Sequence, residues 1–389
     1  MRIRIVFLLG TLRMGGTERQ FLETIRRLDR RRFDPRVLAL PDSGPIRAEI
    51  EALGVPVARL GLPPAQGAFH LSSLIGLGRM FRDMLRYLRR ERPHILQSYQ
   101  FWTNIYAAVA GKIAGTPVIL TGRRESLDPK YRRVWKLALR DLSNRWATAI
   151  LANSERVRAE CLRAERFLAP EKIQVIYNGV DFARYAVPQA SLAIKAALNF
   201  PNDAPVVGVI ARLHPRKGHR DFLNAAAIIL REQPDTRFLL VGADQGMRPE
   251  LEALASELGI ADAVAFTGEQ QEIPALLAAI DILVSCSRIE GLSNAIMEGM
   301  AAGKAIIATN IDGTPELVRQ EETGLLIPQG DPAQLAAAAL RLLHDSALRR
   351  RLGDAARERA KTLFQMDNMI QQTEAFYERC LRQAQSVDA

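Results

Sequence analysis

With 389 residues, the chain is too long for a single ordinary core and of the right length for two domains. Its hydrophobic fraction of 48% and charged fraction of 25% are typical of a soluble globular protein, and no run approaches the roughly 20 consecutive apolar residues of a membrane span, so we expect a cytoplasmic protein. The formal net charge of +10 favours an anionic partner, whereas three widely separated cysteines argue against a zinc site or a disulfide framework.

The first residues predict the start of a nucleotide-binding α/β domain. Ile3 to Leu9 is a continuous apolar run, as expected of a buried strand, and a glycine-containing loop leads from it into an amphipathic helix that opens at Thr17. The loop lacks the G-x-G-x-x-G spacing of dinucleotide-binding enzymes, so it gives little support for a nicotinamide cofactor. Gly15 and Gly16 would let a phosphate approach the backbone closely, although a plain turn explains them equally well.

Apolar runs and helical patterns then alternate up to residue 121, which predicts a parallel sheet covered by helices on both faces. The helix expected at residues 76–92 has methionine and leucine on one side and arginine on the other. It is either a core helix with a solvated basic back or a helix that lies on an anionic membrane, and a second basic stretch, Lys130 to Arg145, favours the surface function. Nucleic acid is the rival partner, but the aromatic residues do not alternate regularly with the arginines, so we expect no nucleic acid.

A domain boundary is expected between about residues 178 and 188. Asn178-Gly179 is a strong turn signal, and the residues that follow lose their periodicity. We therefore assign residues 1–183 to an N-terminal domain and residues 184–365 to a second domain, with the C-terminal helix at 366–389 joining the first. Residues 1–185 contain 33 lysines and arginines against 17 acidic residues, so the positive charge is concentrated in the first domain.

The second domain opens with the same pattern as the first. Val206 to Ile210 predicts a buried strand, and the loop ARLHPRKG that follows carries Arg212 and Lys217 before the next helix. Two cations at the carboxyl end of a first strand, where open α/β sheets bind ligands, suit a diphosphate. Solvation at the surface is the alternative explanation for these two charges.

The segment from Ser285 to Glu316 predicts a strand, a polar loop, a helix and a second strand. Ser293 and Asn294 are good N-cap residues, so we expect the helix to begin there, with Glu290 in the preceding loop. A carboxylate before a helix terminus and a second one, Glu298, one turn inside it suit a ligand that carries phosphates and sugar hydroxyls. No D-x-D pair and no cluster with metal-ligand spacing occurs in the sequence, so we expect no metal-dependent chemistry.

Several motifs together resemble one known family. They are the Gly15-Gly16 loop, Asn153-Ser154 at a strand end, IYNGVD from Ile176, ARLHPRKG from Ala211, VGA from Val241, FTG from Phe266 and EGLSNAIMEGMAAGKAIIAT from Glu290. In this combination the sequence resembles the retaining glycosyltransferases of family 4 type, the glycosyl transferases group 1, over nearly its whole length. The resemblance implies the α/β fold called GT-B, in which two Rossmann-like domains with parallel sheets face each other across an interdomain cleft.

The resemblance also implies a role for individual residues. Arg212 and Lys217 would neutralise the donor diphosphate in place of a metal, and Glu290 would contact the donor sugar near its reacting carbon, so these three are the implied catalytic residues. Glu298 would hydrogen-bond the ribose, and the loop after Gly268 would contact the base. The implied donor-binding residues are Gly15, Gly16, Arg212, Lys217, Gly242, Gly268, Glu269, Glu290, Gly291, Leu292, Ser293, Asn294 and Glu298.

An activity follows from the same resemblance. It implies transfer of a sugar, with retention and without a metal or cofactor, from a UDP-, GDP- or ADP-sugar to a hydroxyl of a glycan or lipid-linked acceptor. Such acceptors belong to cell-surface polysaccharide, lipopolysaccharide or glycolipid synthesis, so we expect a cytoplasmic protein in peripheral contact with an anionic membrane. Two alternatives stay open: another GT-B enzyme, such as a sugar-nucleotide epimerase or a glycan phosphorylase, and a basic nucleic-acid-binding protein.

One position departs from the family pattern. Many members carry a histidine after the strand that corresponds to Val118 to Thr121, where it contacts the donor sugar. This sequence has TGRRES at that place, with Arg123 nearest to the expected histidine. We therefore expect Arg123 to contact the donor or the acceptor.

Overall fold

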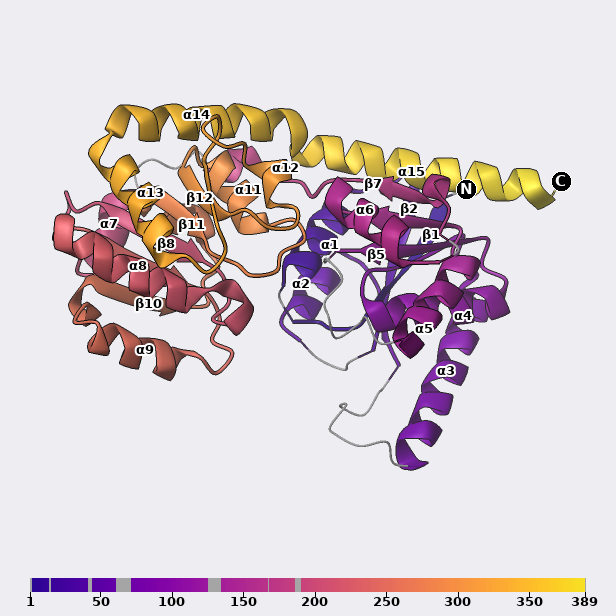
Figure 1. Ribbon diagram of the computed structural model, residues 1–389. Coiled ribbons are helices and arrows are strands. Elements are labelled where there is room, and N and C mark those ends of the chain that lie inside the picture. Colours follow the sequence, from indigo (N-terminus) through magenta and orange to yellow (C-terminus); the bar gives the residue numbers. More distant parts are fainter. Residues whose placement is uncertain are drawn as a thin grey trace. The chain divides into compact units, whose positions relative to one another are not determined.

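The structure is a computed structural model that describes residues 2–13, 15–40, 44–60, 71–124, 134–166, 168–185 and 190–388. It divides the chain into two compact units, each built on a parallel sheet (Figure 1). Unit 1 comprises residues 1–178 and 367–389, and unit 2 comprises residues 179–366. The sequence predicts the division at 183/184, a few residues after the Asn178-Gly179 turn.

Unit 1 contains a seven-stranded sheet in the order β3-β2-β1-β4-β5-β6-β7, and every neighbouring pair is parallel. The central strands are buried on both faces, as their continuous apolar runs predict. The strands are β1 (Ile3–Leu9), β2 (Phe33–Ala39), β3 (Val57–Arg59), β4 (Ile95–Ser98), β5 (Val118–Arg123), β6 (Ala149–Ala152) and β7 (Ile173–Val175).

The helices that cover this sheet include one that the sequence did not predict. Residues 134–146 form α5, where the sequence indicated only the basic stretch from Lys130 to Arg145. The first four residues of that stretch, 130–133, lie outside the described residues. The amphipathic helix α3 is confirmed, because Met80, Met84 and Leu88 are buried against the sheet. The helices are α1 (Gly16–Arg27), α2 (Ile46–Ala52), α3 (Leu71–Glu91), α4 (Phe101–Ala114), α5 (Val134–Trp146), α6 (Glu155–Ala164) and α15 (Met366–Asp388).

The C-terminal helix α15 packs on unit 1. The buried ring of Tyr377 meets Phe33 edge to face at 6.0 Å, and its hydroxyl donates a hydrogen bond to Gln97 on β4. Arg32, between α1 and β2, forms ion pairs with Glu374 and Glu378 of α15. These contacts hold the C-terminal helix α15 against the N-terminal part of unit 1.

Unit 2 contains a six-stranded parallel sheet in the order β10-β9-β8-β11-β12-β13. The order reverses between β8 and β11, which makes their carboxyl ends the place where open α/β sheets bind ligands. The strands are β8 (Val206–Ile210), β9 (Arg237–Val241), β10 (Val264–Gly268), β11 (Ile282–Ser285), β12 (Ala305–Thr309) and β13 (Leu325–Ile327).

The helices of unit 2 differ from the sequence prediction near the C-terminal end. The residue pattern from 333 to about 360 predicts helix throughout. The structure instead breaks it at Asp345, whose carboxylate accepts the N–H of Leu348 at 2.8 Å. Aspartate at an N-cap begins a new helix because it satisfies an amide that has no partner within the helix. The helices are α7 (Ala190–Ala197), α8 (His219–Glu232), α9 (Arg248–Glu257), α10 (Ile273–Ala279), α11 (Asn294–Ala301), α12 (Thr314–Leu317), α13 (Pro332–His344) and α14 (Ser346–Leu363).

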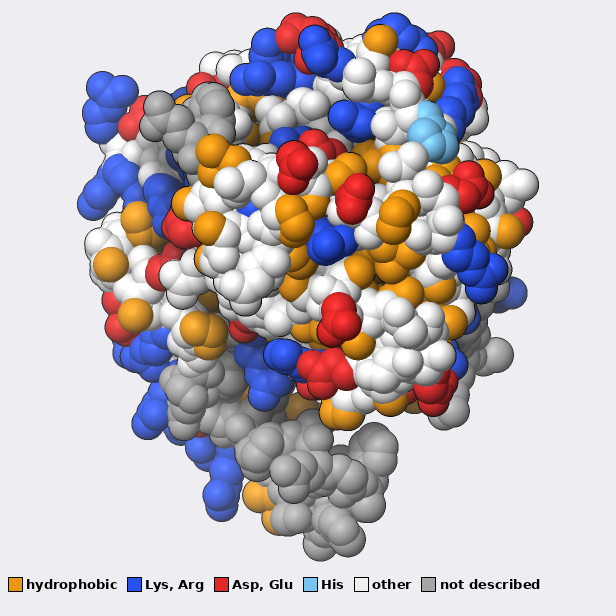
Figure 2. Space-filling view, turned by 90° about the vertical axis from the view of Figure 1, so that its left-hand side faces the viewer, with side chains coloured by type: hydrophobic (Ala, Val, Ile, Leu, Met, Phe, Trp, Pro, Cys, Tyr) orange, Lys and Arg blue, Asp and Glu red, His pale blue; other side chains and the backbone are white. Residues whose placement is uncertain are grey.

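The surface of unit 2 is mixed in charge. Figure 2 shows a face formed largely by unit 2, on which basic, acidic and apolar side chains are interspersed. Within the described ranges, no helix of either unit is both long and apolar enough to cross a membrane.

Candidate active site at the carboxyl edge of unit 2

The structure brings two predicted site residues into direct contact at the carboxyl ends of β8 and β11. The Nζ of Lys217, after β8, forms an ion pair with the Oε2 of Glu290, after β11. The Oγ of Ser287 donates to the same carboxylate oxygen at 3.0 Å. The side chains of Lys217 and Glu290 are 21% and 16% exposed, so the pair is partly screened from water but reachable by a ligand.

A glycine allows these two loops to approach each other. Gly218 has a φ of +70°, and a Cβ at this position would lie 1.9 Å from the carbonyl oxygen of Cys286. The Sγ of Cys286 donates to the carbonyls of Lys217 and Gly218 at 3.3 and 3.2 Å, and burial raises the pKa of this thiol to about 12. The loop that carries Lys217 is therefore fixed against the end of β11 by its backbone.

Two residues that hold Glu290 were not found from sequence. Besides the Ser287 hydroxyl, the carboxylate of Asp312 accepts the backbone N–H of Glu290 at 2.9 Å. Asp312 has a φ of +41°, a region that asparagine and aspartate enter more readily than most residues. The sequence could have indicated Asp312 by its position. It follows β12 and therefore lies at the same sheet edge as the loop after β11.

The helix after Glu290 begins where the sequence predicted. Ser293 is the N-cap of α11, and its Oγ accepts the N–H of Ile296 at 3.4 Å. Gly291 and Leu292, which precede the cap, are buried, and Asn294 is the first residue of the helix. Glu298 is also buried, one turn further along. The two acids that the sequence singled out thus lie on either side of one helix start.

The remaining predicted residues of unit 2 gather at the ends of β8, β9 and β10. The N–H of Gly242 donates to the carbonyl of Gly268 at 2.9 Å, and a Cβ on Gly242 would lie 2.1 Å from the carbonyl of Ala211. Arg212 is exposed, and its own carbonyl lies 3.0 Å from the Nε2 of the buried His219. Glu269 is exposed just beyond Gly268. Arg212, Gly242 and Gly268 therefore share the edge that carries Lys217.

The predicted residues of unit 1 lie at the corresponding edge of its sheet. Gly15 is the N-cap of α1 and Gly16 is its first residue, after the carboxyl end of β1. In the first turn of this helix the buried carboxylate of Glu18 accepts a hydrogen bond of 2.8 Å from the Nε2 of Gln100, which follows β4. Glu18 and Gln100 thus connect β1 and β4, between which the strand order of unit 1 reverses.

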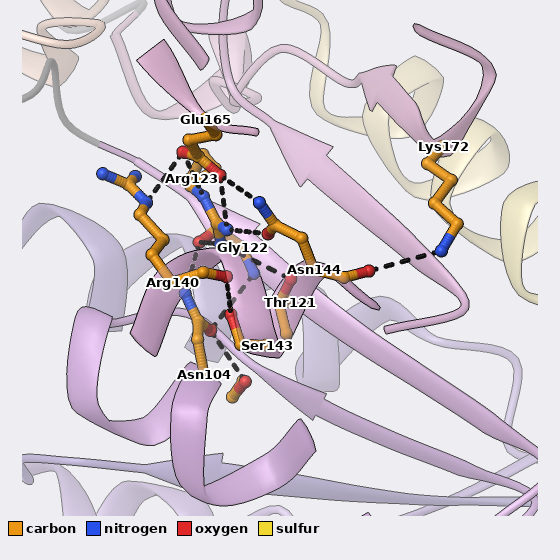
Figure 3. Close-up of polar contacts among 10 residues, drawn as sticks. Asn104, Thr121, Gly122, Arg123, Arg140, Ser143, Asn144, Glu165 and Lys172 are labelled. Atoms are coloured by element: carbon orange, nitrogen blue, oxygen red, sulfur yellow. Dashed lines mark hydrogen bonds and ion pairs between the residues drawn. The ribbon is translucent and has the colours of Figure 1, made fainter. Parts of the chain in front are cut away.

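The expectation for Arg123 is corrected by the structure. Its buried side chain turns into the interior of unit 1, where Nη2 lies 3.0 Å from the Oε2 of Glu165 (Figure 3). The Nε of Arg140 lies 2.7 Å from the other oxygen, and Asn144 also donates to Glu165. Burial acts to raise the pKa of Glu165, but the two arginine charges outweigh it and lower this pKa to about 2. Arg123 therefore belongs to an interior ion-pair cluster and does not offer its guanidinium to a ligand.

Comparison with known proteins identifies the family. Residues 191–359 match the model described as glycosyl transferases group 1, and residues 15–179 match the glycosyl transferase 4-like domain. The chain belongs to this glycosyltransferase family. The two matched ranges fall in the two structural units to within one residue, and the glutamates, cations and glycines described above lie within these ranges.

Relatives of this glycosyltransferase include enzymes with different acceptors. The chain is 29% identical to a 2-deoxystreptamine glucosyltransferase of Streptomyces kanamyceticus, over 78% of this chain and 82% of the relative. It is 26% identical to the UDP-Gal:alpha-D-GlcNAc-diphosphoundecaprenol alpha-1,3-galactosyltransferase of Escherichia coli, over 86% of each chain. Both relatives transfer a hexose.

A solved structure also resembles this glycosyltransferase over its full length. HepE of Anabaena, crystallised with UDP-glucose, superimposes with a TM-score of 0.86 at 24% identity, covering 97% of this chain and 100% of that chain. The two parallel sheets of seven and six strands are those of the GT-B fold, as the sequence predicted. In the described part of the chain, no group of three histidine, cysteine or acidic side chains is arranged as a metal site.

Proposed function

We propose that this glycosyltransferase moves a hexose from a UDP-sugar to a hydroxyl acceptor, with retention of the anomeric configuration and without a metal. The observation that carries the proposal is the Lys217–Glu290 ion pair beside the start of α11, at the strand-order reversal of unit 2. This arrangement places a cation and a carboxylate at the edge where open α/β sheets bind nucleotides. The UDP donor is supported by the names of the galactosyltransferase relative and of the HepE complexes.

The donor is assigned to the site in three parts. Lys217 and Arg212, together with the backbone at the start of α11, face the diphosphate, because cations and helix termini both favour negative charge. Glu290 contacts the sugar, and Glu298 contacts the ribose. The base lies at the ends of β9 and β10, beside Gly242, Gly268 and Glu269.

Catalysis in this proposal depends on the leaving group. The bond from the anomeric carbon to the diphosphate breaks, the acceptor oxygen bonds to the same face of that carbon, and its proton passes to the departing phosphate oxygen. Fixed cations at the diphosphate stabilise the charge that accumulates there in the transition state. The Oε2 of Glu290 already accepts hydrogen bonds from Lys217 and Ser287, so we assign Glu290 to positioning the sugar rather than to proton transfer.

The acceptor is assigned to surface glycan synthesis. The galactosyltransferase relative acts on a sugar linked to diphosphoundecaprenol, and a partial relative of Rhizobium meliloti, 39% identical over 192 residues, takes part in lipopolysaccharide core biosynthesis. These names support a glycan or lipid-linked acceptor in polysaccharide, lipopolysaccharide or glycolipid synthesis. We also propose a place on the cytoplasmic face of an anionic membrane, where such an acceptor would be presented.

Product analysis tests the proposal directly. Thermal-shift screening with UDP, GDP and ADP should show strong stabilisation by UDP, since a ligand that binds only the folded state raises its stability. Incubation with UDP-hexoses and candidate acceptors should then release UDP and give a glycoside whose anomeric configuration, read by NMR, equals that of the donor. The rate should be unchanged by a chelator. An inverted product, an epimerised sugar nucleotide, or activity lost to the chelator and restored by a divalent cation would each contradict a part of the proposal.

A further inference from the structure

Exposed apolar side chains are concentrated on one part of unit 1. Among the described residues, eight large apolar side chains are exposed, and six of them belong to α3, α4 and α5. These three helices lie side by side, since α4 contacts both α3 and α5 (Figure 1). We call their outer side the α3–α5 surface; its exposed apolar residues are Ile75, Leu77, Trp102, Ile113, Trp135 and Leu142. Single exposed apolar residues are ordinary, but such a concentration indicates an interaction site.

The most exposed aromatic side chains of this surface lie together. The ring of Trp102, the second residue of α4, is 6.2 Å from the ring of Trp135, the second residue of α5. Tyr106 stacks on Trp102 at 6.3 Å, and Phe101 meets it edge to face at 5.1 Å. The tryptophans are nevertheless 41% and 48% exposed, so packing within the unit covers only part of them.

The same surface carries a band of positive charge. The exposed side of α3 presents arginines at 79, 82, 86, 89 and 90, against two acidic residues in the whole helix. Asp83 lies 3.3 Å from Arg82 and 3.4 Å from Arg86, and such exposed pairs contribute little because water and salt screen them. Lys136 of α5 lies over the ring of Trp135 at 5.3 Å, so cationic and aromatic groups are adjacent there as well.

Four of the six exposed apolar residues lie in the first two turns of their helices. Helices α3, α4 and α5 each follow a strand of a parallel sheet, so all three begin on the side of its carboxyl edge. Ile75 and Leu77 lie in the second turn of α3, and Trp102 and Trp135 lie in the first turns of α4 and α5. The apolar end of the α3–α5 surface thus borders the sheet edge that carries Gly15 and Gly16, and the arginines lie further along α3.

We propose that the α3–α5 surface docks this enzyme on an anionic lipid bilayer. Ile75, Leu77, Trp102 and Trp135 enter the headgroup region, where amphipathic aromatic rings are favoured, and the arginines of α3 face the anionic headgroups. The inference deepens the proposed function, because it identifies the surface that brings the carboxyl edge of unit 1 to a lipid-linked acceptor. Charge complementarity favours a bilayer over a second copy of the chain. If two copies met through this surface, the five α3 arginines of one would face and repel the five of the other. The exposed aliphatic residues distinguish this surface from one built for nucleic acid.

Vesicle binding without donor or acceptor tests the docking separately from catalysis. The full chain is sedimented with vesicles of phosphatidylglycerol and phosphatidylcholine, and with phosphatidylcholine alone, at about 50 mM and about 500 mM salt. We expect binding to the anionic vesicles that weakens about tenfold at high salt. Reversing three charges together, Arg79→Glu, Arg82→Glu and Arg86→Glu, should weaken it by about a hundredfold or more, since each basic residue near such a surface contributes about 1 kcal/mol. Ile75→Ser with Leu77→Ser should weaken binding several-fold.

Matched variants on unit 2 control for general surface effects. Leu192→Ser removes an equally exposed apolar residue from α7, and Arg231→Glu with Arg350→Glu reverses exposed charges on α8 and α14; all three should leave vesicle binding unchanged. UDP stabilisation of each variant, measured alongside, shows whether its nucleotide site is intact. A normal UDP response without vesicle binding would thus separate failure of the docking from failure of the proposed function.

Tryptophan fluorescence locates the contact on the surface. The chain has three tryptophans, and two of them belong to the proposed contact. Anionic vesicles should shift their emission to shorter wavelength, and brominated lipids should quench it. Trp102→Phe with Trp135→Phe leaves Trp146 alone and should abolish both effects. The proposal is overturned if vesicle binding is absent or insensitive to salt, if the surface variants bind as well as the unaltered protein, or if they instead abolish a concentration-dependent dimer.

Discussion

The Lys217–Glu290 pair sets the chemistry at the scale of single residues. If Lys217 neutralises the diphosphate and Glu290 positions the sugar, Lys217→Ala and Glu290→Gln should each reduce kcat about a hundredfold or more, since each removes a group that acts on the transition state. Initial rates with a UDP-hexose measure the effect. The control is the ion pair between Arg220 and Glu250 of unit 2, whose side chains are 53% and 49% exposed; Arg220→Ala and Glu250→Gln should stay within about twofold. Full activity of either site variant would refute its assigned role.

Gly218 offers a sharper test of how the site is assembled. Gly218→Ala should lower the Tm of unit 2 and weaken UDP binding, because its Cβ would overlap the carbonyl of Cys286 and the left-handed backbone adds about 1–2 kcal/mol of strain. Gly259 is the matched control, since its φ is +69° but nothing lies within 4 Å of the position that a Cβ would occupy there. Calorimetry of both variants isolates the overlap. Equal losses for Gly218→Ala and Gly259→Ala would show that the two loops are not tightly packed.

Local spacing predicted some site residues and missed others for a physical reason. Glu290, Ser293 and Lys217 lie next to strand and helix ends, so sequence alone indicated their exposure and their neighbours. The position of Arg123 at the end of β5 suggested a ligand contact in the same way. Its partner, Glu165, is 42 residues further along, and sequence spacing did not indicate that both side chains are buried together.

At the scale of elements, the cluster around Glu165 fixes α5 to the rest of unit 1. One carboxylate joins Arg123 of β5, Arg140 of α5 and the end of α6. Glu165→Gln should therefore destabilise unit 1 by about 3–5 kcal/mol, because it leaves two buried guanidinium groups without a counter-charge. Urea unfolding monitored by tryptophan fluorescence measures this loss of stability, since two of the three tryptophans are in α5 and the third is in α4. An unchanged midpoint would mean that the cluster adds no net stability.

The same carboxylate predicts a dependence on pH. Its pKa in the folded chain is about 2, below the ordinary value of 4.5, so the ionised form is stabilised by folding. The contribution is complete above about pH 4.5 and is lost as the pH falls towards 2. In that window the unfolding free energy of the unaltered protein should fall more steeply than that of Glu165→Gln. Parallel slopes would contradict the assignment.

Elements with strong local signals were predicted well, and others required tertiary information. The bounds of β1 and β8 are as predicted, because continuous apolar runs are specific for strands buried on both faces. Helix α5 was missed because Arg140, Ser143 and Asn144 interrupt its apolar pattern although all three are buried. The break between α13 and α14 depends on one aspartate cap, which the helical pattern on either side obscured.

At the scale of the whole molecule, charge and ligand contacts are divided between the units. The first 185 residues carry a net charge of +16 in a chain whose total is +10, which suits the binding of unit 1 to an anionic surface. The proposed diphosphate contact Lys217, by contrast, lies on unit 2 and is paired with an acidic residue, Glu290. A division of this kind lets a nucleotide and a bilayer bind to different units.

This division predicts different effects of UDP on the two units. All three tryptophans lie in unit 1, so fluorescence follows its unfolding, while calorimetry follows both units. At about one hundred times its Kd, UDP stabilises the unit that binds it by about 2.7 kcal/mol, which for a unit of this size raises Tm by about 5–10 °C. We expect this rise in the unit 2 transition, a smaller one in the fluorescence midpoint, and neither in Lys217→Ala. An equal rise in both transitions would show that UDP stabilises unit 1 as much as unit 2. Gly15 and Gly16 would then be the first residues to substitute in a search for the contact.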